Sequence, residues 1–150
     1  MTSASQISAM GKLQFVFTIA SVLLLGACNA GDPERRPEPF SEIGETETIW
    51  LNGTEPFWGG SVQGDRFIYT TAEAQDGTLI AVRRFAGNSG LGFAGTIGGT
   101  SVDLTVTQGE CSDAMSDRIY PYHATLKFGD DLRNGCAWTD SRSYSGPRRP

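Results

Sequence analysis

A regular alternation of apolar and polar residues over residues 101–108 is the feature that most constrains the fold of this chain. The apolar members are Val102, Leu104 and Val106. These side chains share one face of a strand, because successive residues of a strand point to opposite sides. Residues 91–97 repeat the pattern, with Gly95 at an inward position. The sequence therefore predicts antiparallel strands with one buried face.

Two-residue turn signals separate further segments of this kind. They are Gly64-Asp65, Asp76-Gly77, Gly98-Gly99 and Gly129-Asp130. The segments cover residues 58–62, 66–70, 79–85, 91–97, 101–108, 122–128 and 132–138. We therefore expect an all-β fold, a small antiparallel meander of seven or eight strands that forms a barrel or strongly curved sheet. No long helix is expected after the N-terminal leader.

The first 28 residues resemble the leader of a bacterial lipoprotein. An apolar run over residues 13–25 ends at Leu25-Gly26-Ala27-Cys28, which looks like a lipobox. In such proteins the cysteine carries a diacylglycerol and becomes the new N-terminus, so residues 1–27 would form a signal peptide. A transmembrane span is the alternative, but this run is shorter than the roughly 20 apolar residues that a bilayer core needs. Cys28 is therefore the predicted lipidation site.

The residues around this leader bear on location and on the start of translation. Lys12 is the only charged residue before the apolar run, and Met10 would give a tighter basic region than Met1. Asn29 follows the cysteine. In Gram-negative lipoproteins, Asp at that position is the familiar signal for retention in the inner membrane. The resemblance thus favours an outer-membrane anchor that faces the periplasm or the cell surface.

Composition divides the rest of the chain. Residues 28–47 are rich in Pro and Glu and predict a solvated, disordered tether. Residues 48–140 hold the β domain, and residues 141–150 predict a disordered tail, with a weak contact to anionic lipid or sugar as the alternative. The net charge of −5 makes nucleic acid an unsuitable partner.

Lipidation of Cys28 would leave Cys111 and Cys136 as an even pair in an oxidising compartment, which predicts a disulfide. Such a bridge would stabilise the fold by roughly 3–4 kcal/mol. A metal site is the alternative, but two separate cysteines and a single histidine are a poor ligand set. Alternation predicts that Cys136, with Leu132 and Trp138, faces the core.

No catalytic motif stands out. Residues 90–95 match the glycine pattern of dinucleotide-binding loops, but no helix is expected after them. The chain has no nucleophile elbow or phosphate loop, and alternation places His123 on a polar face. We therefore expect a non-enzymatic protein without cofactor or metal.

Two segments stand out for another reason. They are Gly53-Thr54-Glu55-Pro56-Phe57-Trp58 and Cys111-Ser112-Asp113-Ala114-Met115-Ser116-Asp117-Arg118, the latter followed by Tyr120-Pro121-Tyr122 and Gly135-Cys136-Ala137. Together they resemble a family of uncharacterised bacterial envelope proteins and lipoproteins, in some of which such a domain accompanies META-type domains. The family has no established activity to transfer. Ala114 stands where its pattern usually has Gly, which argues against a positive backbone φ at that position.

The residues of these motifs have structural and functional interpretations. Phe57 and Trp58 would point to opposite faces, one into the core and the other outward as a binding aromatic with Glu55 at its edge. Ser112 or Asp113 would cap backbone amides, while Asp117 would pair with Arg118 or Arg133. A cation site and a pair of glycosidase carboxylates are the alternatives, but both lack the required ligands or spacing.

These observations leave two functions open besides an enzyme. The first is a non-catalytic, lipid-anchored envelope protein that binds a protein or a cell-wall component, in the manner of the small acidic barrel lipoproteins that inhibit lysozyme. The second is a carrier of a small hydrophobic ligand, which needs an unfilled interior. The candidate binding residues are Glu55, Phe57, Trp58, Asp113, Asp117 and Arg118.

Overall fold

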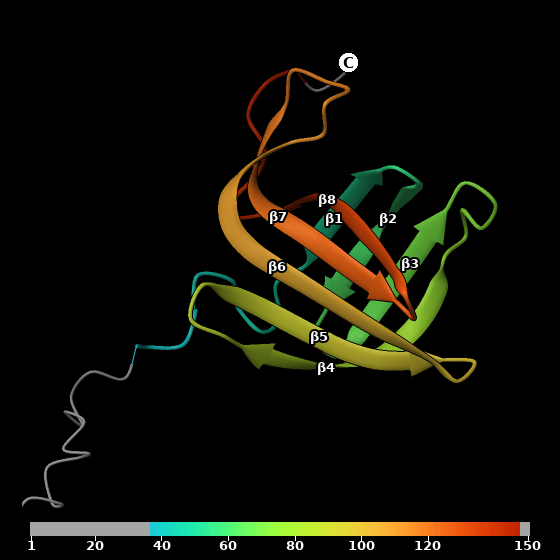
Figure 1. The fold of residues 1–150 in the computed structure, drawn as a ribbon. Helices are drawn as coiled ribbons and strands as arrows, with labels where there is room; N and C mark the ends of the chain where they lie inside the picture. Colours follow the sequence, from blue (N-terminus) through green and yellow to red (C-terminus); the bar gives the residue numbers. More distant parts are fainter. Residues whose placement is uncertain (1–36, 148–150) are drawn as a thin grey trace, which may run out of the picture. The chain divides into compact units, whose positions relative to one another are not determined.

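The structure is a computed structural model that describes residues 37–147 and contains eight strands. In chain order they are β1 (Ile49–Thr54), β2 (Phe57–Gln63), β3 (Arg66–Thr71), β4 (Thr78–Ala86), β5 (Gly90–Ile97), β6 (Thr100–Ser112), β7 (Ile119–Phe128) and β8 (Asp131–Thr139). Consecutive strands pair antiparallel, and β8 pairs with β1 to close a barrel (Figure 1). The predicted all-β meander is confirmed. Residues 37–147 contain no apolar helix of membrane-spanning length.

The strand that closes the barrel is the one that the sequence did not indicate. The seven expected segments correspond to β2–β8, whereas β1 contains Asn52-Gly53, a dipeptide typical of turns. Gly53 is nevertheless inside the strand and pairs with Trp58 of β2 and Gly135 of β8. A methyl group on Gly53 would lie 1.9 Å from Nε1 of Trp58, so the glycine makes room for the indole ring.

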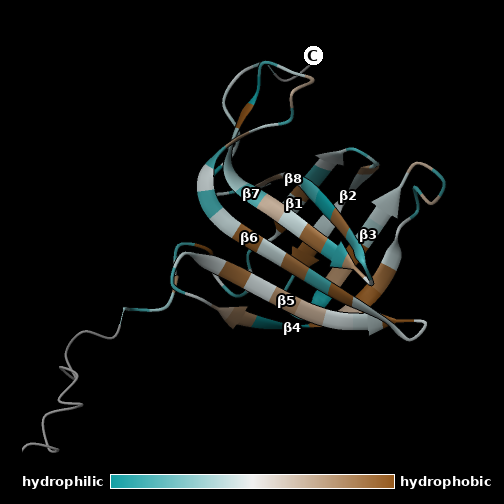
Figure 2. Ribbon diagram, in the orientation of Figure 1, coloured by the Kyte–Doolittle hydropathy of each residue, from teal (hydrophilic) through white to brown (hydrophobic). Residues whose placement is uncertain are grey.

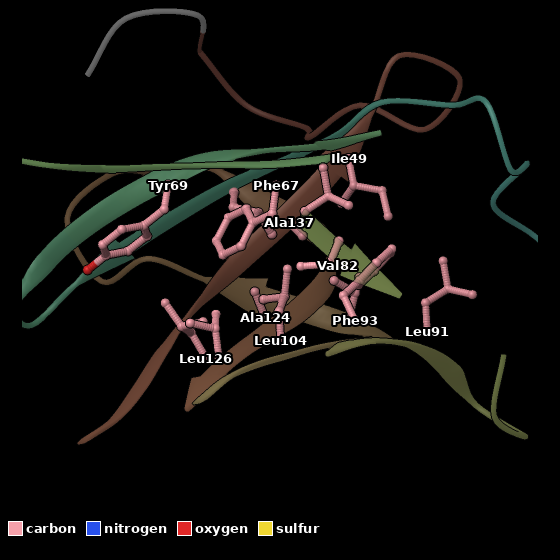
Figure 3. Close-up of a cluster of buried hydrophobic side chains, with 14 of the residues drawn as sticks. Ile49, Phe67, Tyr69, Val82, Leu91, Phe93, Leu104, Ala124, Leu126 and Ala137 are labelled. Atoms are coloured by element: carbon pink, nitrogen blue, oxygen red, sulfur yellow. The ribbon is translucent and has the colours of Figure 1, made fainter. Parts of the chain in front are cut away.

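Alternating residues from all eight strands fill the interior of the barrel. Figure 2 shows the alternation along β6, whose inward residues Val102, Leu104 and Val106 are buried. They pack in one cluster that includes Phe67, Phe93 and Leu126 (Figure 3). Tyr69 lies at one end of the group drawn there. Burial of these side chains provides most of the driving force for folding.

The predicted face of Cys136 was wrong. Cys136 pairs with the exposed His123 of β7, and its neighbour Ala137 points inward, so Cys136 lies on the outer face of the barrel. Leu132, of the same parity, is 65% exposed. The error arose because the inward residues of β8 are small, so they did not mark the core-facing side of the strand. The large Trp58 side chain covers this part of the wall instead, and it donates a hydrogen bond to the Asn134 carbonyl at 3.2 Å.

Cys136 is still buried, because a second cluster covers it from outside. This outer cluster consists of Cys111, Tyr120, Cys136, Trp138 and Tyr144. The Cys111–Cys136 disulfide is present, as predicted, and joins β6 to β8. The three aromatic rings lie 5.3–5.7 Å apart between centroids. The barrel therefore has two apolar clusters, one on each side of its wall.

Both segments that flank the barrel are more ordered than the sequence suggested. Ile43, in the predicted tether, is only 2% exposed and belongs to the interior cluster. The Phe40 amide donates to the Gly87 carbonyl at 2.7 Å, and Glu42 forms an ion pair with Arg142. At the other end, Ser145 bridges to Ile119 of β7. The packed domain thus extends beyond residues 48–140 on both sides.

The signal peptide, Cys28, most of the tether and the last three residues lie outside the described residues.

Candidate functional site

The two motifs singled out in the sequence, residues 53–58 and 111–118, meet at one surface hollow. The hollow has a volume of about 680 Å³ and lies between the β1–β2 turn and the loop that joins β6 to β7. It is lined by Thr54, Glu55, Pro56, Phe57, Asp113, Ala114 and Met115. Of the six candidate binding residues, Glu55, Phe57 and Asp113 therefore lie together, although they are far apart in the sequence.

The β1–β2 turn places the first motif. Thr54 pairs with Phe57, so the chain reverses over Glu55 and Pro56, and both residues are exposed. Phe57 is 59% exposed, whereas Trp58 is 4% exposed and belongs to the interior cluster. The prediction that one of the two aromatic residues is core and the other is on the surface is confirmed. Trp58 is accordingly a structural residue outside the hollow.

The Asp113 side chain holds the opposite wall in shape. Its Oδ1 accepts hydrogen bonds from the amides of Met115 (3.1 Å) and Ser116 (2.9 Å), which confirms the expected capping role. The hydroxyls of Ser116 and Tyr120 donate to Oδ2. Burial opposes ionisation, but these donors outweigh it and keep the pKa of Asp113 below its usual value. The loop therefore carries a carboxylate at neutral pH.

Tyr120 connects this loop to the barrel wall. Its hydroxyl donates to Asp113 at 3.1 Å and accepts from Nδ2 of Asn52, in β1, at 3.2 Å. Tyr120 is 1% exposed and packs against Trp138 and Tyr144 in the outer cluster. Figure 1 shows the loop between β6 and β7 beside the C-terminal segment. The outer cluster and its disulfide thus fix the loop against the barrel.

Ala114 corrects one expectation. Its φ is +56°, a left-handed conformation that glycine adopts with less strain. The Ser112 hydroxyl accepts a hydrogen bond from the Ala114 amide at 3.2 Å, within the turn that Asp113 also stabilises. The hydrogen bonds of the loop hold the alanine in this conformation, so the absence of glycine did not prevent it.

The remaining two candidates do not line the hollow. Asp117 is exposed beyond it. The Arg118 guanidinium lies 4.7 Å from the centroid of the Tyr144 ring, and its Nε donates to the Pro147 carbonyl at 2.8 Å. Arg133, the other expected partner of Asp117, forms its ion pair with Asp131 at 3.4 Å. Arg118 therefore holds the C-terminal segment in place beside the loop.

Sequence reasoning missed three residues that shape the site. Met115 lines the hollow and is 62% exposed, while Asn52 and Tyr120 support it from below. The Tyr120-Pro121-Tyr122 segment was part of the motif, and the alternation that predicts Tyr122 on the apolar side of its strand gave no sign that Tyr120 packs outside the barrel. Tyr122 is inside, in the interior cluster.

A second open hollow lies on the other side of Phe57. It has a volume of about 530 Å³, and its lining includes Tyr69, Phe128 and Arg133. The Arg133 guanidinium lies 6.0 Å from each of these two ring centroids. Asp131 pairs with this guanidinium, and Glu73 is in the lining. The positive charge of Arg133 in this second hollow is therefore already balanced by carboxylates.

The first hollow combines carboxylic acids with apolar side chains. Its titratable lining residues are Glu55 and Asp113. The Asp113 oxygens are occupied by hydrogen bonds of the loop itself, so they are poorly placed to transfer protons. Over residues 37–147, no three His, Cys, Asp or Glu side chains gather in a way that could hold a metal ion.

Comparisons with protein-family models, with curated proteins and with solved structures found no match for this chain.

Proposed function

We propose that this chain is a non-catalytic, lipid-anchored protein of the bacterial outer membrane that binds a protein or cell-wall component at the hollow between its two motifs. The observation that carries the proposal is the convergence of Glu55, Phe57 and Asp113 on this hollow. Phe57 and Met115 are large apolar side chains, yet each is more than half exposed there. Exposed apolar residues next to a preformed hollow are typical of a recognition site.

The interior of the barrel favours this function over a ligand carrier. A carrier needs free volume within the barrel, whereas the interior here is occupied by aromatic and aliphatic side chains. Phe67, Phe93 and Leu104 are each at most 1% exposed and pack together. In small barrels of this kind, the inward side chains themselves fill the interior.

The site can be tested in cells by photocrosslinking. A photoreactive phenylalanine analogue at Phe57 should give adducts that mass spectrometry identifies as protein or glycan. Phe85, which is also 59% exposed but lies in β4, is a matched control. We expect adducts at position 57 that are absent at position 85. Equal crosslinking at the two positions, or none at 57, would contradict the proposed site.

The anchor needs its own experiment, since Cys28 lies outside the described residues. A Cys28→Ala protein should lose the acyl mass and remain unprocessed at the lipobox. Intact mass spectrometry of membrane fractions measures both. If the variant still yields an acylated, cleaved protein, the lipoprotein part of the proposal is wrong.

A further inference from the structure

We propose that the hollow at Phe57 and Met115 binds a lysine or arginine side chain presented by a partner protein. This inference rests on the proposed function and narrows its ligand from an unspecified envelope component to a basic protein surface. It follows from the charge, the apolar walls and the rigidity of the hollow.

Charge is the first argument. The ionisable lining residues are Glu55 and Asp113, both carboxylic acids. Glu55 is exposed, and its side chain makes no hydrogen bond or ion pair with any other residue of the described range. The net charge of the whole chain is −5. A cation that enters the hollow is attracted by both carboxylates, and the field of the protein favours its approach.

The apolar walls are the second argument. Lysine and arginine carry a charged head on a long aliphatic stem, so they fit a site that is apolar along its sides and acidic at its edge. Phe57 and Met115 offer such sides, at 59% and 62% exposure. Phe57 is also an exposed aromatic residue, and contact of a cation with an aromatic face favours lysine and arginine over neutral groups.

Rigidity is the third argument. The Asp113 carboxylate receives hydrogen bonds from two amides and from the Ser116 and Tyr120 hydroxyls, so the wall that carries Ala114 and Met115 is held before any partner arrives. Binding to a preformed site loses less conformational entropy than binding to a loop that must first order. Asp113 thus supplies charge to the hollow while its oxygens maintain the loop.

The lining argues against a glycan as the ligand. Recognition of sugar hydroxyls uses several side chains that donate and accept hydrogen bonds. The lining of this hollow has the Thr54 hydroxyl and two carboxyls, and its other members are Pro56, Phe57, Ala114 and Met115. A cation satisfies the carboxyls, whereas a neutral sugar leaves them without a countercharge.

Met115 itself provides the reporter for the test. The chain has three methionines, and the other two, Met1 and Met10, precede Cys28. In the mature protein, a methionine methyl label would therefore give a single resonance from inside the hollow. We would place the mature lipidated protein in nanodiscs and titrate it with the N-acetyl amides of lysine, arginine and norleucine, and with N-acetylglucosamine.

The lysine and arginine compounds should shift the Met115 methyl resonance in a saturable manner. Norleucine, which has an apolar side chain of similar length without the ammonium group, should need at least about fivefold higher concentrations. Glu55→Gln should weaken binding of the lysine compound about two- to fivefold. Asp130→Asn, in the exposed β7–β8 turn, removes the same charge elsewhere and should leave binding unchanged.

Equal affinities for lysine and norleucine, or no effect of Glu55→Gln, would overturn the inference. A saturable shift by N-acetylglucosamine without one by the cations would also overturn it and would identify a glycan site. Under either outcome we would still expect crosslinking at Phe57 in cells, because the hollow would still bind a ligand, although not one of the chemistry proposed here. Loss of that crosslinking would instead refute the proposed function itself.

Discussion

The interior and outer clusters of this barrel stabilise it in different ways. The interior cluster draws on all eight strands and follows the period of two, so each of its residues is replaceable by another apolar residue of similar size. The outer cluster joins one disulfide to three aromatic rings from β7, β8 and the C-terminal segment. It lies beneath the loop that carries Asp113. From this comparison we infer that the interior cluster stabilises the barrel, whereas the outer cluster holds the candidate site in shape.

A large cavity in the interior should have the greatest effect on stability. Phe67 is fully buried, and Phe67→Ala should lower the free energy of unfolding by about 3–5 kcal/mol. Urea denaturation measures this change. The comparison also predicts that the Met115 methyl resonance of the folded protein stays where it is in the wild type. A displaced resonance would show that the interior also controls the hollow.

Loss of the disulfide should have the next largest effect and should reach the site. Replacing both Cys111 and Cys136 by Ala should cost about 2–4 kcal/mol, because the unfolded chain is no longer constrained. Unlike the interior cavity, this change should broaden or shift the Met115 resonance, since Cys111 lies near the end of β6, two residues before Asp113 of the loop. An unchanged resonance would separate the outer cluster from the site.

The hydrogen bonds of Asp113 should contribute less, and their effect should depend on pH. Asp113→Ala leaves the amides of Met115 and Ser116 without their acceptor, so it should cost about 1–2 kcal/mol near pH 7. The folded protein lowers the pKa of this carboxyl, so its stabilising contribution is present above the unfolded value of about 3.9. The contribution is lost as the pH falls through the folded-state pKa.

Unfolding free energies of the wild type and the variant should therefore converge below about pH 4. Tyr120→Phe supplies the control, because it removes one donor to the carboxylate and keeps the ring in the outer cluster. The pKa of Asp113 should rise in this variant, which a carbon-detected NMR titration would show. A pKa that stays where it is would mean that Tyr120 does not stabilise the charged form.

The smallest change should be an increase in stability. Ala114→Gly removes the steric cost of a left-handed alanine, and the greater freedom of glycine in the unfolded chain offsets part of the gain. The net effect should be a rise of less than about 1 kcal/mol in the free energy of unfolding. Ala94→Gly, in β5, is the contrasting variant and should destabilise. A loss of stability in Ala114→Gly would mean that the loop does not strain this residue.

Much of the fold could be predicted because strands and tight turns are local features. The alternation of Val102, Leu104 and Val106 and the turn at Gly98-Gly99 depend only on neighbouring residues, and both are confirmed. The errors occurred where a distant residue decided the outcome. Trp58 covers the small inward residues of β8, so the face of Cys136 could not be read from β8 alone.

The candidate site was predicted only in part for the same reason. Asp113 caps its own loop, which the sequence indicated, and Phe57 and Trp58 take opposite faces because they are consecutive in a strand. The fold of the loop against β1 decides which of its residues line the hollow. Met115 lines it, whereas Asp117 and Arg118 do not.

The sequence alone determined seven of the eight strand segments, the tight turns and the pairing of Cys111 with Cys136, because these follow from local periodicity and from the number of cysteines in the domain. Only the tertiary structure decided that β1 closes the barrel, that Ile43 is part of the core, and that two distant motifs form one hollow. These features depend on contacts between residues far apart in the chain, and such contacts leave no local pattern.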